Sequence, residues 1–358
     1  MKVLICTGRY YMGGIEKYVH DLSIHLSDSK IQVFLLVFYK IKIDEIKFLK
    51  SKNIVFYELN GKNGRDFKMI YDFFRIIKKV KPSIIHLNVL PILSFIPLLF
   101  FKGKIIYTIH QMDTHYWTNF FFNKIIDGII FLSENVKNHY TRINYLSKPQ
   151  PIIISNGVQI YTCNLYRISQ KYINLVMVSR LAQDKQPHLA IEILSYLVKN
   201  SRLKYHLTFI GDGDTLDKFY VEQLHYNVIK YKLDSYVTFK GWQENVSPFL
   251  LDAQGFLMLS RRECFPYNVL EAMSIGIPIF SFKVEGGLVD MHQNKVTGIM
   301  TDSNDPIVLA KEIDAIFNSD KWKILSENAY QNSKRFTINE MTQKTILFYN
   351  QILNNKTI

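Results

Sequence analysis

Short apolar runs alternate with amphipathic helical stretches along this chain, and the whole pattern occurs twice. In the first half, β-branched and aromatic runs of strand length are separated by segments with apolar residues at helical spacing. The expected strands are residues 2–7, 31–39, 54–59, 84–87, 105–109, 128–132 and 152–154, and the expected helices are 15–27 and 67–79. Strands that are apolar throughout and joined by helices are typical of a doubly wound parallel sheet.

The pattern starts again after residue 172. The second set of expected strands is 174–178, 205–210, 237–240, 255–259 and 277–280, with helices at 187–199, 215–230 and 268–274. We therefore expect two Rossmann-like α/β domains that meet near residues 158–172 and face each other across a cleft, because ligands of such sheets bind beyond the carboxyl ends of the strands. Two tail helices, 319–334 and 338–354, have no strand after them, and one is expected to brace the first domain.

Composition agrees with a two-domain protein. The chain has 358 residues, of which 48% are hydrophobic and 21% charged, a balance that excludes extended disorder. Its three cysteines, Cys6, Cys163 and Cys264, lie far apart and form no C-x-x-C pair. This spacing excludes a disulfide framework, disfavours a zinc site and indicates a reducing, cytosolic compartment.

The apolar segments predict neither an export signal nor a spanning helix. The run that ends at Cys6 is too short for the apolar region of a signal peptide. The longest apolar stretch, residues 84–101, contains His86, Asn88 and two prolines, whereas a spanning helix needs about 20 apolar residues. We expect a strand there, followed by a buried or membrane-grazing helix.

The net charge of +13 is concentrated in the first half of the chain. Residues 1–160 carry 22 Lys and Arg against 11 Asp and Glu, and the remainder carries 22 against 20. Such a basic half indicates nucleic acid, an anionic membrane surface, or simply a lysine-rich solvated face. No RNP, helix-turn-helix or zinc-finger pattern accompanies it, so a nucleic-acid partner is not expected.

Two motifs indicate phosphate binding. Gly13 and Gly14 precede the first expected helix, where free N–H groups and the helix dipole favour an anion; a tight βα turn is the alternative. Arg180 and Lys185 follow the first strand of the second half, where they can clamp a diphosphate or form an ordinary solvated pair.

A third motif, Glu263 with Glu271, spans a loop and the start of a helix. Carboxylates suit bidentate hydrogen bonds to sugar hydroxyls, although two unrelated surface acids would give the same letters.

The order of these motifs resembles the retaining glycosyltransferases of family 4, which have the two-domain GT-B fold. The matching segments are Gly13-Gly14-Ile15-Glu16, Thr108-Ile109-His110, Ser155-Asn156-Gly157-Val158, Ser179-Arg180 with Lys185, Gly211-Asp212-Gly213, Gly241-Trp242, Glu263 to Glu271, Gly286-Gly287 and Thr297-Gly298. The resemblance covers about residues 1–300 and is most specific in the second half. It implies an acceptor-binding domain over 1–165, completed by a helix at about 338–358, and a nucleotide-sugar-binding domain over 166–337.

The resemblance also implies a role for each residue. Catalytic roles fall to Glu263, Arg180, Lys185 and His110. Contacts with the nucleotide-sugar fall to Gly13, Gly14, Gly211, Trp242, Gln243, Phe265, Asn268, Val269, Leu270 and Glu271. Glu271 would hold the ribose and Glu263 the transferred sugar, and Arg180 and Lys185 would neutralise the leaving diphosphate.

No metal or other cofactor is expected, because two fixed cations and helix N-termini can stabilise the leaving charge instead. The Asp212-Gly213-Asp214 letters are rejected as a metal site, since the family has a G-D-G turn there. Two departures from the family pattern, Cys264 beside the first glutamate and Leu288–Met291 after the paired glycines, remove no charge that the mechanism needs.

The prediction is thus a metal-independent retaining enzyme. It moves a hexose or N-acetylhexosamine from a UDP- or GDP-sugar to a carbohydrate acceptor. The basic first half and the aromatic residues of 116–122 favour a lipid-linked acceptor in cell-surface polysaccharide synthesis, with the enzyme cytoplasmic and peripheral to the membrane. The alternative is a catalytically silent GT-B subunit that binds nucleotide or scaffolds a partner. The donor, the acceptor, the linkage and the oligomeric state do not follow from the sequence.

Overall fold

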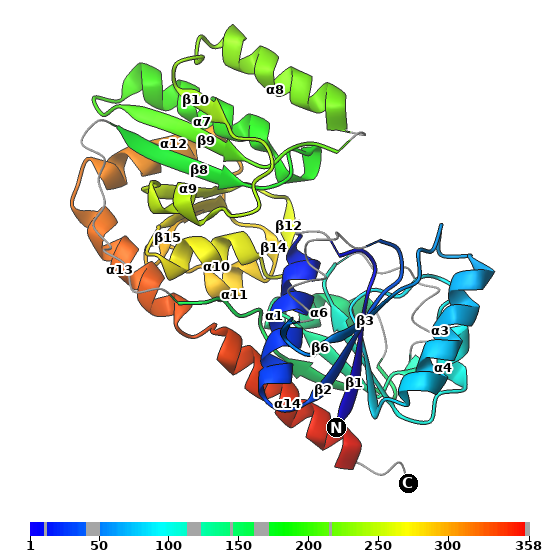
Figure 1. Cartoon of the computed structure of the whole chain (residues 1–358). Helices are drawn as coiled ribbons and strands as arrows, with labels where there is room; N and C mark the ends of the chain where they lie inside the picture. Colours follow the sequence, from blue (N-terminus) through cyan, green and yellow to red (C-terminus); the bar gives the residue numbers. More distant parts are fainter. Residues whose placement is uncertain are drawn as a thin grey trace. The chain divides into compact units, whose positions relative to one another are not determined.

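The computed structural model describes residues 1–10, 13–40, 51–112, 123–143, 146–160, 172–214 and 217–354. The chain forms two compact units, each built on its own parallel sheet (Figure 1). Unit 1 comprises Met1–Gly157 and Ile338–Ile358, and unit 2 comprises Val158–Thr337.

Unit 1 contains a seven-stranded sheet in the order β3-β2-β1-β4-β5-β6-β7, and every pairing in it is parallel. Its strands are β1 (Lys2–Thr7), β2 (Gln32–Val37), β3 (Val55–Glu58), β4 (Ile84–Leu87), β5 (Lys104–Ile109), β6 (Gly128–Phe131) and β7 (Gln150–Ile153). Its helices are α1 (Gly14–Asp28), α3 (Phe67–Val80), α4 (Ile96–Leu99), α6 (Glu134–Ile143) and α14 (Ile338–Asn354).

Unit 2 repeats this architecture with a six-stranded sheet in the order β10-β9-β8-β11-β13-β15. Its strands are β8 (Ile173–Val178), β9 (Tyr205–Ile210), β10 (Val237–Phe239), β11 (Gly255–Met258), β13 (Ile279–Phe282) and β15 (Gly298–Thr301). A separate two-stranded sheet pairs β12 (Arg262–Glu263) with β14 (Glu285–Gly286). The helical elements are η1 (Gln183–Lys185), α7 (Pro187–Asn200), α8 (Lys218–Lys230), α9 (Ser247–Leu251), α10 (Tyr267–Ser274), α11 (Leu288–Met291), α12 (Pro306–Phe317) and α13 (Lys321–Ser333).

The α/β fold predicted from the sequence is confirmed, with differences at the level of elements. β13 begins at Ile279, two residues later than expected, because Pro278 has no N–H to donate to the ladder. The helices α6 and α12, the strand β15 and the β12–β14 pair were not predicted. Aromatic residues 116–122 and the cysteine at position 163 lie outside the described residues.

The last helix, α14, belongs to unit 1 and packs against α1. Phe348 and Tyr349 of α14 are fully buried. The Tyr349 hydroxyl lies 2.6 Å from Nδ1 of His86 in β4, and the ring of Phe348 covers Gly128 in β6. The final segment of the chain therefore completes the core of the unit that contains the first residue.

Candidate active site

In each sheet the order of the strands reverses beside the first strand of the unit. The charged candidate residues of unit 2 follow the two strands at that point. In unit 2 the strands at this switch point are β8 and β11. Arg180 and Lys185 follow β8, and Glu263 follows β11. The carboxyl ends of strands at such a point are where open α/β sheets bind ligands.

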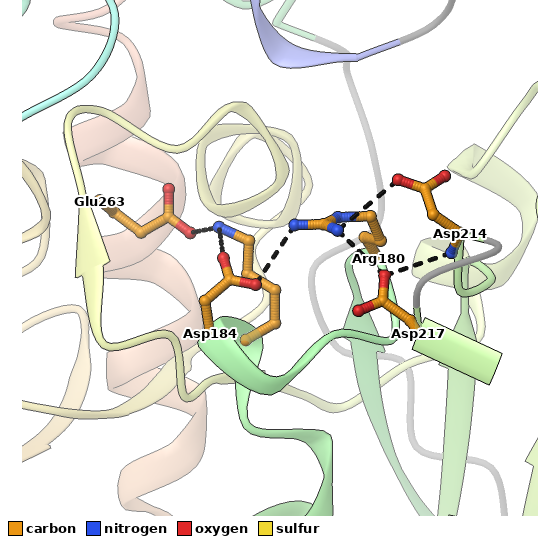
Figure 2. A network of polar contacts seen from close by, with 6 residues as sticks. Arg180, Asp184, Asp214, Asp217 and Glu263 are labelled. Atoms are coloured by element: carbon orange, nitrogen blue, oxygen red, sulfur yellow. Dashed lines mark hydrogen bonds and ion pairs between the residues drawn. The ribbon is translucent and has the colours of Figure 1, made fainter. Parts of the chain in front are cut away.

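Lys185 and Glu263 form a close ion pair. Their Nζ and Oε1 atoms are 2.8 Å apart, and Asp184 lies 3.5 Å from the same ammonium (Figure 2). Burial lowers the pKa of Lys185, but the attraction of Glu263 and Asp184 outweighs this effect and raises the pKa above its ordinary value. Both side chains are mostly buried, so the pair is a fixed part of the site.

Arg180 is surrounded by three carboxylates (Figure 2). Its Nη1 lies 3.0 Å from Asp217 and 3.6 Å from Asp214, and its Nη2 lies 3.3 Å from Asp184. Asp217 also accepts a hydrogen bond from the backbone N–H of Asp214 at 3.3 Å. Of the three, Asp217 is the least exposed, with 17% of its side chain exposed against 73% for Asp214 and 54% for Asp184.

Backbone hydrogen bonds join the loops that carry these charges. Leu181 donates to Asp212, Arg261 donates to Asp184, and Gly211 donates to Gly241. Gly211 has φ +129°, and a Cβ atom there would lie 2.0 Å from the carbonyl oxygen of Ser179, so only glycine fits. The loops after β8, β9 and β11 consequently form one rigid edge.

Trp242 and Gln243 follow Gly241 on this edge. The Trp242 side chain is about half exposed, and Gln243 donates from Nε2 to the carbonyl oxygen of Lys240 at 2.7 Å. The exposed indole of Trp242 lies in a loop that this hydrogen bond holds in place, and such an indole can stack on a planar ligand.

The helix α10 presents the other predicted residues. Asn268 donates from Nδ2 to the carbonyl oxygen of Val178 at 2.6 Å, which ties the start of α10 to the end of β8. Its Oδ1 accepts from Val269, and Leu270 donates to Pro266. The N–H groups of Val269 and Leu270 are thus engaged within the protein, and a ligand that uses them must compete for them.

Three further predicted or neighbouring side chains of this segment differ in burial. Phe265 and Cys264 are buried, whereas Glu271 is partly exposed. Cys264 therefore packs inside unit 2.

The predicted residues of unit 1 lie at the carboxyl ends of β1 and β5. Gly13 caps α1, and Gly14 is its first residue. Among the described residues, a Cβ atom on Gly14 would meet nothing within 4 Å, and one on Gly13 would meet the flexible carboxylate of Glu16. Packing among the described residues of unit 1 therefore does not require a glycine at position 14.

His110 follows β5 and contacts Asn88, which follows β4. His110 Nε2 lies 2.9 Å from Oδ1 of Asn88, and the ring of Tyr18 meets the imidazole edge-on at 4.9 Å. Asn88 donates from Nδ2 to the carbonyl oxygen of Cys6 at 3.4 Å, so its Oδ1 faces the imidazole and Nε2 carries the proton. Burial lowers the pKa of His110 to about 3, and the ring is therefore neutral, with Nδ1 as an acceptor.

Sequence reasoning missed four side chains of these sites: Asn88, Asp184, Asp214 and Asp217. Asn88 directly follows β4, and the three aspartates lie in the loops after β8 and β9, where the sequence carries no signal that distinguishes them. The structure joins Arg180, Lys185 and Glu263 in one network of unit 2, and separately joins His110 to Asn88 in unit 1.

Comparison with known proteins identifies the family of the chain. Residues 12–160 match the family described as "Glycosyltransferase Family 4", and residues 166–336 match "Glycosyl transferases group 1". The chain belongs to glycosyltransferase family 4. This confirms the family predicted from the motifs, and it makes the chain a glycosyltransferase of a retaining family.

Two relatives of this glycosyltransferase have names that state an activity. One, from Campylobacter jejuni, is "GalNAc-alpha-(1->4)-GalNAc-alpha-(1->3)-diNAcBac-PP-undecaprenol alpha-1,4-N-acetyl-D-galactosaminyltransferase"; it is 26% identical over 51% of this chain and about half of its own length, 49%. The other, from Escherichia coli, is "UDP-Gal:alpha-D-GlcNAc-diphosphoundecaprenol alpha-1,3-galactosyltransferase", 22% identical over 74% of each chain.

Solved structures confirm the GT-B fold of the family 4 chain. HepE from Anabaena, in complex with UDP and glucose, superposes with a TM-score of 0.84 at 18% identity and covers 98% of this chain and 100% of its own. Sucrose-phosphate synthase from Thermosynechococcus elongatus gives 0.82 at 18% identity, over 99% and 100%.

Proposed function

We propose that this glycosyltransferase moves a hexose or N-acetylhexosamine from a UDP- or GDP-sugar to a carbohydrate acceptor, with retention and without a metal ion. Unit 2, over about 166–337, would bind the donor, and unit 1, over about 1–165 with α14, would bind the acceptor. The observation that carries the proposal is the Lys185–Glu263 pair beside Arg180 at the switch point of the second sheet.

The charges of this network suit the departure of a sugar from a diphosphate. Negative charge then develops on the phosphate, and positive charge develops on the anomeric carbon. Lys185 and Arg180 supply cations beside the phosphate, and Glu263 supplies a carboxylate beside the anomeric carbon. In the retaining mechanism the acceptor hydroxyl attacks from the face that the diphosphate leaves, and a phosphate oxygen takes its proton.

A diphosphate has to compete for Arg180 with the carboxylates that hold it. Asp214 and Asp184 are exposed, and such surface pairs contribute only about 0–1 kcal/mol. Exchange of these two carboxylates for phosphate oxygens is therefore inexpensive. Asp217 stays in contact and holds the guanidinium in position.

The relatives support the choice of donor and acceptor. The names of both state an acceptor on an undecaprenyl diphosphate, and that of the Escherichia coli relative states a UDP-sugar donor. HepE binds UDP and glucose. We therefore propose a lipid-linked oligosaccharide acceptor in cell-surface polysaccharide synthesis, and a cytoplasmic enzyme at the membrane surface.

Release of nucleotide in the presence of EDTA tests this proposal. The purified chain is given UDP- and GDP-sugars in turn, and free UDP or GDP is followed. Slow hydrolysis of one donor that disappears in Glu271→Ala and Arg180→Ala supports it. Binding of UDP or GDP without turnover, even when lipid-linked acceptors are added, favours the silent GT-B subunit instead. Absence of both binding and turnover overturns the proposal.

A further inference from the structure

One face of unit 1 exposes large apolar side chains from two adjacent segments. In α3, Phe67 and Tyr71 are 78% and 62% exposed and lie four residues apart, on one face of the helix. Around α4, Ile92, Ile96, Leu99 and Phe100 are exposed at similar spacing. We call these six side chains the α3–α4 face.

The two segments lie side by side. Gly64, just before α3, accepts a hydrogen bond from Leu93, and the ring of Phe74 in α3 contacts the ring of Phe100 edge-on at 6.3 Å. Figure 1 shows α3 and α4 next to each other in unit 1. The α3–α4 face is therefore one continuous surface, and large exposed apolar patches mark binding sites for membranes or proteins.

Cations surround this face. Residues 60–103 carry eight Lys and Arg and only two Asp or Glu. The eight, all exposed, are Lys62, Arg65, Lys68, Arg75, Lys78, Lys79, Lys81 and Lys102.

The acidic side chains of the same segment do not offset this charge. Asp66 caps α3 by accepting from two backbone N–H groups, and Asp72 lies 3.8 Å from Arg75. Lys78 extends over the ring of Phe74, with Nζ 4.3 Å from the centroid, and Arg75 lies over Tyr71. Cationic side chains that pack against aromatic rings suit the interface of a bilayer. The rings can enter the boundary of the acyl chains while the charges contact the lipid headgroups.

We propose that the α3–α4 face docks unit 1 onto an anionic lipid bilayer. This rests on the proposed function and names the surface that would bring the enzyme to a lipid-linked acceptor. No helix among the described residues is long and apolar enough to cross a membrane. Ile92 follows Asn88, the partner of His110, by only four residues, so the face is linked to the acceptor side of the candidate site by a short loop.

Charge distinguishes this face from another apolar surface of the chain. In unit 2, α8 exposes Phe219, Tyr226 and Ile229 to a similar extent. That helix carries two lysines and one glutamate, with no comparable basic cluster. It therefore provides a matched control for apolar exposure without charge.

Sedimentation with lipid vesicles tests the proposal. The whole chain is mixed with vesicles of equal parts phosphatidylglycerol and phosphatidylcholine, and with vesicles of phosphatidylcholine alone. Three variants are compared: Phe67→Ser with Phe100→Ser, Lys78→Gln with Lys79→Gln, and the control Phe219→Ser with Ile229→Ser. Thermal unfolding and UDP binding of each variant report separately on folding and on the donor site.

We expect the wild type to sediment with the anionic vesicles and the α8 control to behave like it. The phenylalanine variant should bind more than about tenfold more weakly. Each neutralised lysine should weaken binding about fivefold, and added salt should weaken it further.

Several results would overturn the proposal: no binding of the wild type, equal binding to neutral vesicles, or α3–α4 variants that bind like the wild type. A change in sedimentation mass of these variants without vesicles would place a second copy of the chain on this face and would also overturn it. Because vesicle binding needs no sugar donor, this outcome is independent of whether nucleotide release is observed.

Discussion

The ammonium of Lys185 lies 2.8 Å from Oε1 of Glu263, although 78 residues separate the two along the chain. The contact joins the loop after β8 to the short strand β12. Attraction by Glu263 and Asp184 raises the pKa of Lys185 despite its burial, so the ammonium stays charged at neutral pH. Under the proposed function, this contact couples the cation at the leaving diphosphate to the carboxylate at the transferred sugar.

This coupling predicts that Lys185 and Glu263 act as a unit in donor turnover. Lys185→Ala should lower the rate of nucleotide release by about 100-fold, because it removes a cation from the leaving group and strands a mostly buried carboxylate. Glu263→Gln should lower the rate by a similar factor, and the double variant should be no worse than either single one. Losses that multiply in the double variant would contradict a shared role.

Asp217 is predicted to position Arg180. Its buried carboxylate contacts Nη1 at 3.0 Å, whereas the exposed Asp214 lies 3.6 Å away. Asp217→Asn should reduce kcat for nucleotide release about tenfold with little change in donor KM, since the guanidinium acts on the leaving charge. Asp214→Asn is the matched control and should change kcat less than about threefold. Equal effects of the two variants on kcat would contradict a positioning role that is specific to Asp217.

Gly14 is predicted to matter for the ligand and not for the fold. No atom in the described part of unit 1 lies within 4 Å of a Cβ atom built at this position. Gly14→Ala should keep or raise the free energy of unfolding, by about 0.5 kcal/mol, because alanine loses less entropy in a helix. Nucleotide release should nevertheless fall, since the added methyl occupies space that the donor needs.

Gly211→Ala is the opposite case and serves as the comparison. With φ +129° and the Ser179 oxygen 2.0 Å from the new Cβ, it should cost about 3 kcal/mol of stability. Chemical denaturation of the two variants, beside their activities, separates the roles. A strongly destabilised Gly14→Ala protein would argue against the ligand role.

A carboxylate in place of Asn88 is predicted to make His110 titrate in the pH range of the assay. The pKa of His110 is about 3, so its protonation does not affect activity between pH 5 and 8 in the wild type. Asn88→Asp places a carboxylate beside Nε2 and should raise this pKa into the pH range of the assay. The ring is then charged at lower pH, and nucleotide release should fall about tenfold per pH unit below the new pKa. Asn88→Ala, which adds no charge, should show no such acidic limb in its pH–rate profile.

His86 is predicted to make unit 1 sensitive to acid. Burial lowers its pKa to about 3, and Tyr349 and Thr108 bond to its two ring nitrogens. The unfolded state, with a pKa near 6.5, binds the proton that the folded state rejects. The contribution of neutral His86 to the free energy of unfolding is therefore complete above pH 6.5. It is lost as pH falls towards 3, by about 1.4 kcal/mol per pH unit. His86→Gln should flatten the decrease in unfolding free energy between pH 6 and 4 relative to the wild type, whereas parallel curves would contradict this assignment.

The sequence predicted what depends on local pattern. Strand and helix periodicity located most elements, and the motif order located the Glu263, Arg180 and Lys185 side chains that the structure joins. The missed strand β15 has only two large apolar residues, Ile299 and Met300, between Gly298 and Thr301, so no apolar run marks it in the sequence.

The partners of those residues depend on tertiary contacts and were not predictable. Asn88 lies in an apolar run, and its importance arises because β4 and β5 are neighbours in the sheet. Asp184 lies in the loop after β8, and Asp214 and Asp217 lie in the loop after β9. In the sequence both loops look like ordinary solvated turns, and only the fold brings the three carboxylates together around Arg180.

The return of α14 to unit 1 has a consequence for biosynthesis. A ribosome adds Phe348, which lies against Gly128, and Tyr349, which bonds to His86, only after it has added all of unit 2. All of Val158–Thr337 has been translated by then. Unit 1 therefore begins to emerge before unit 2 but is completed after it, and until α14 has been translated the side chains that this helix covers lack their apolar partner.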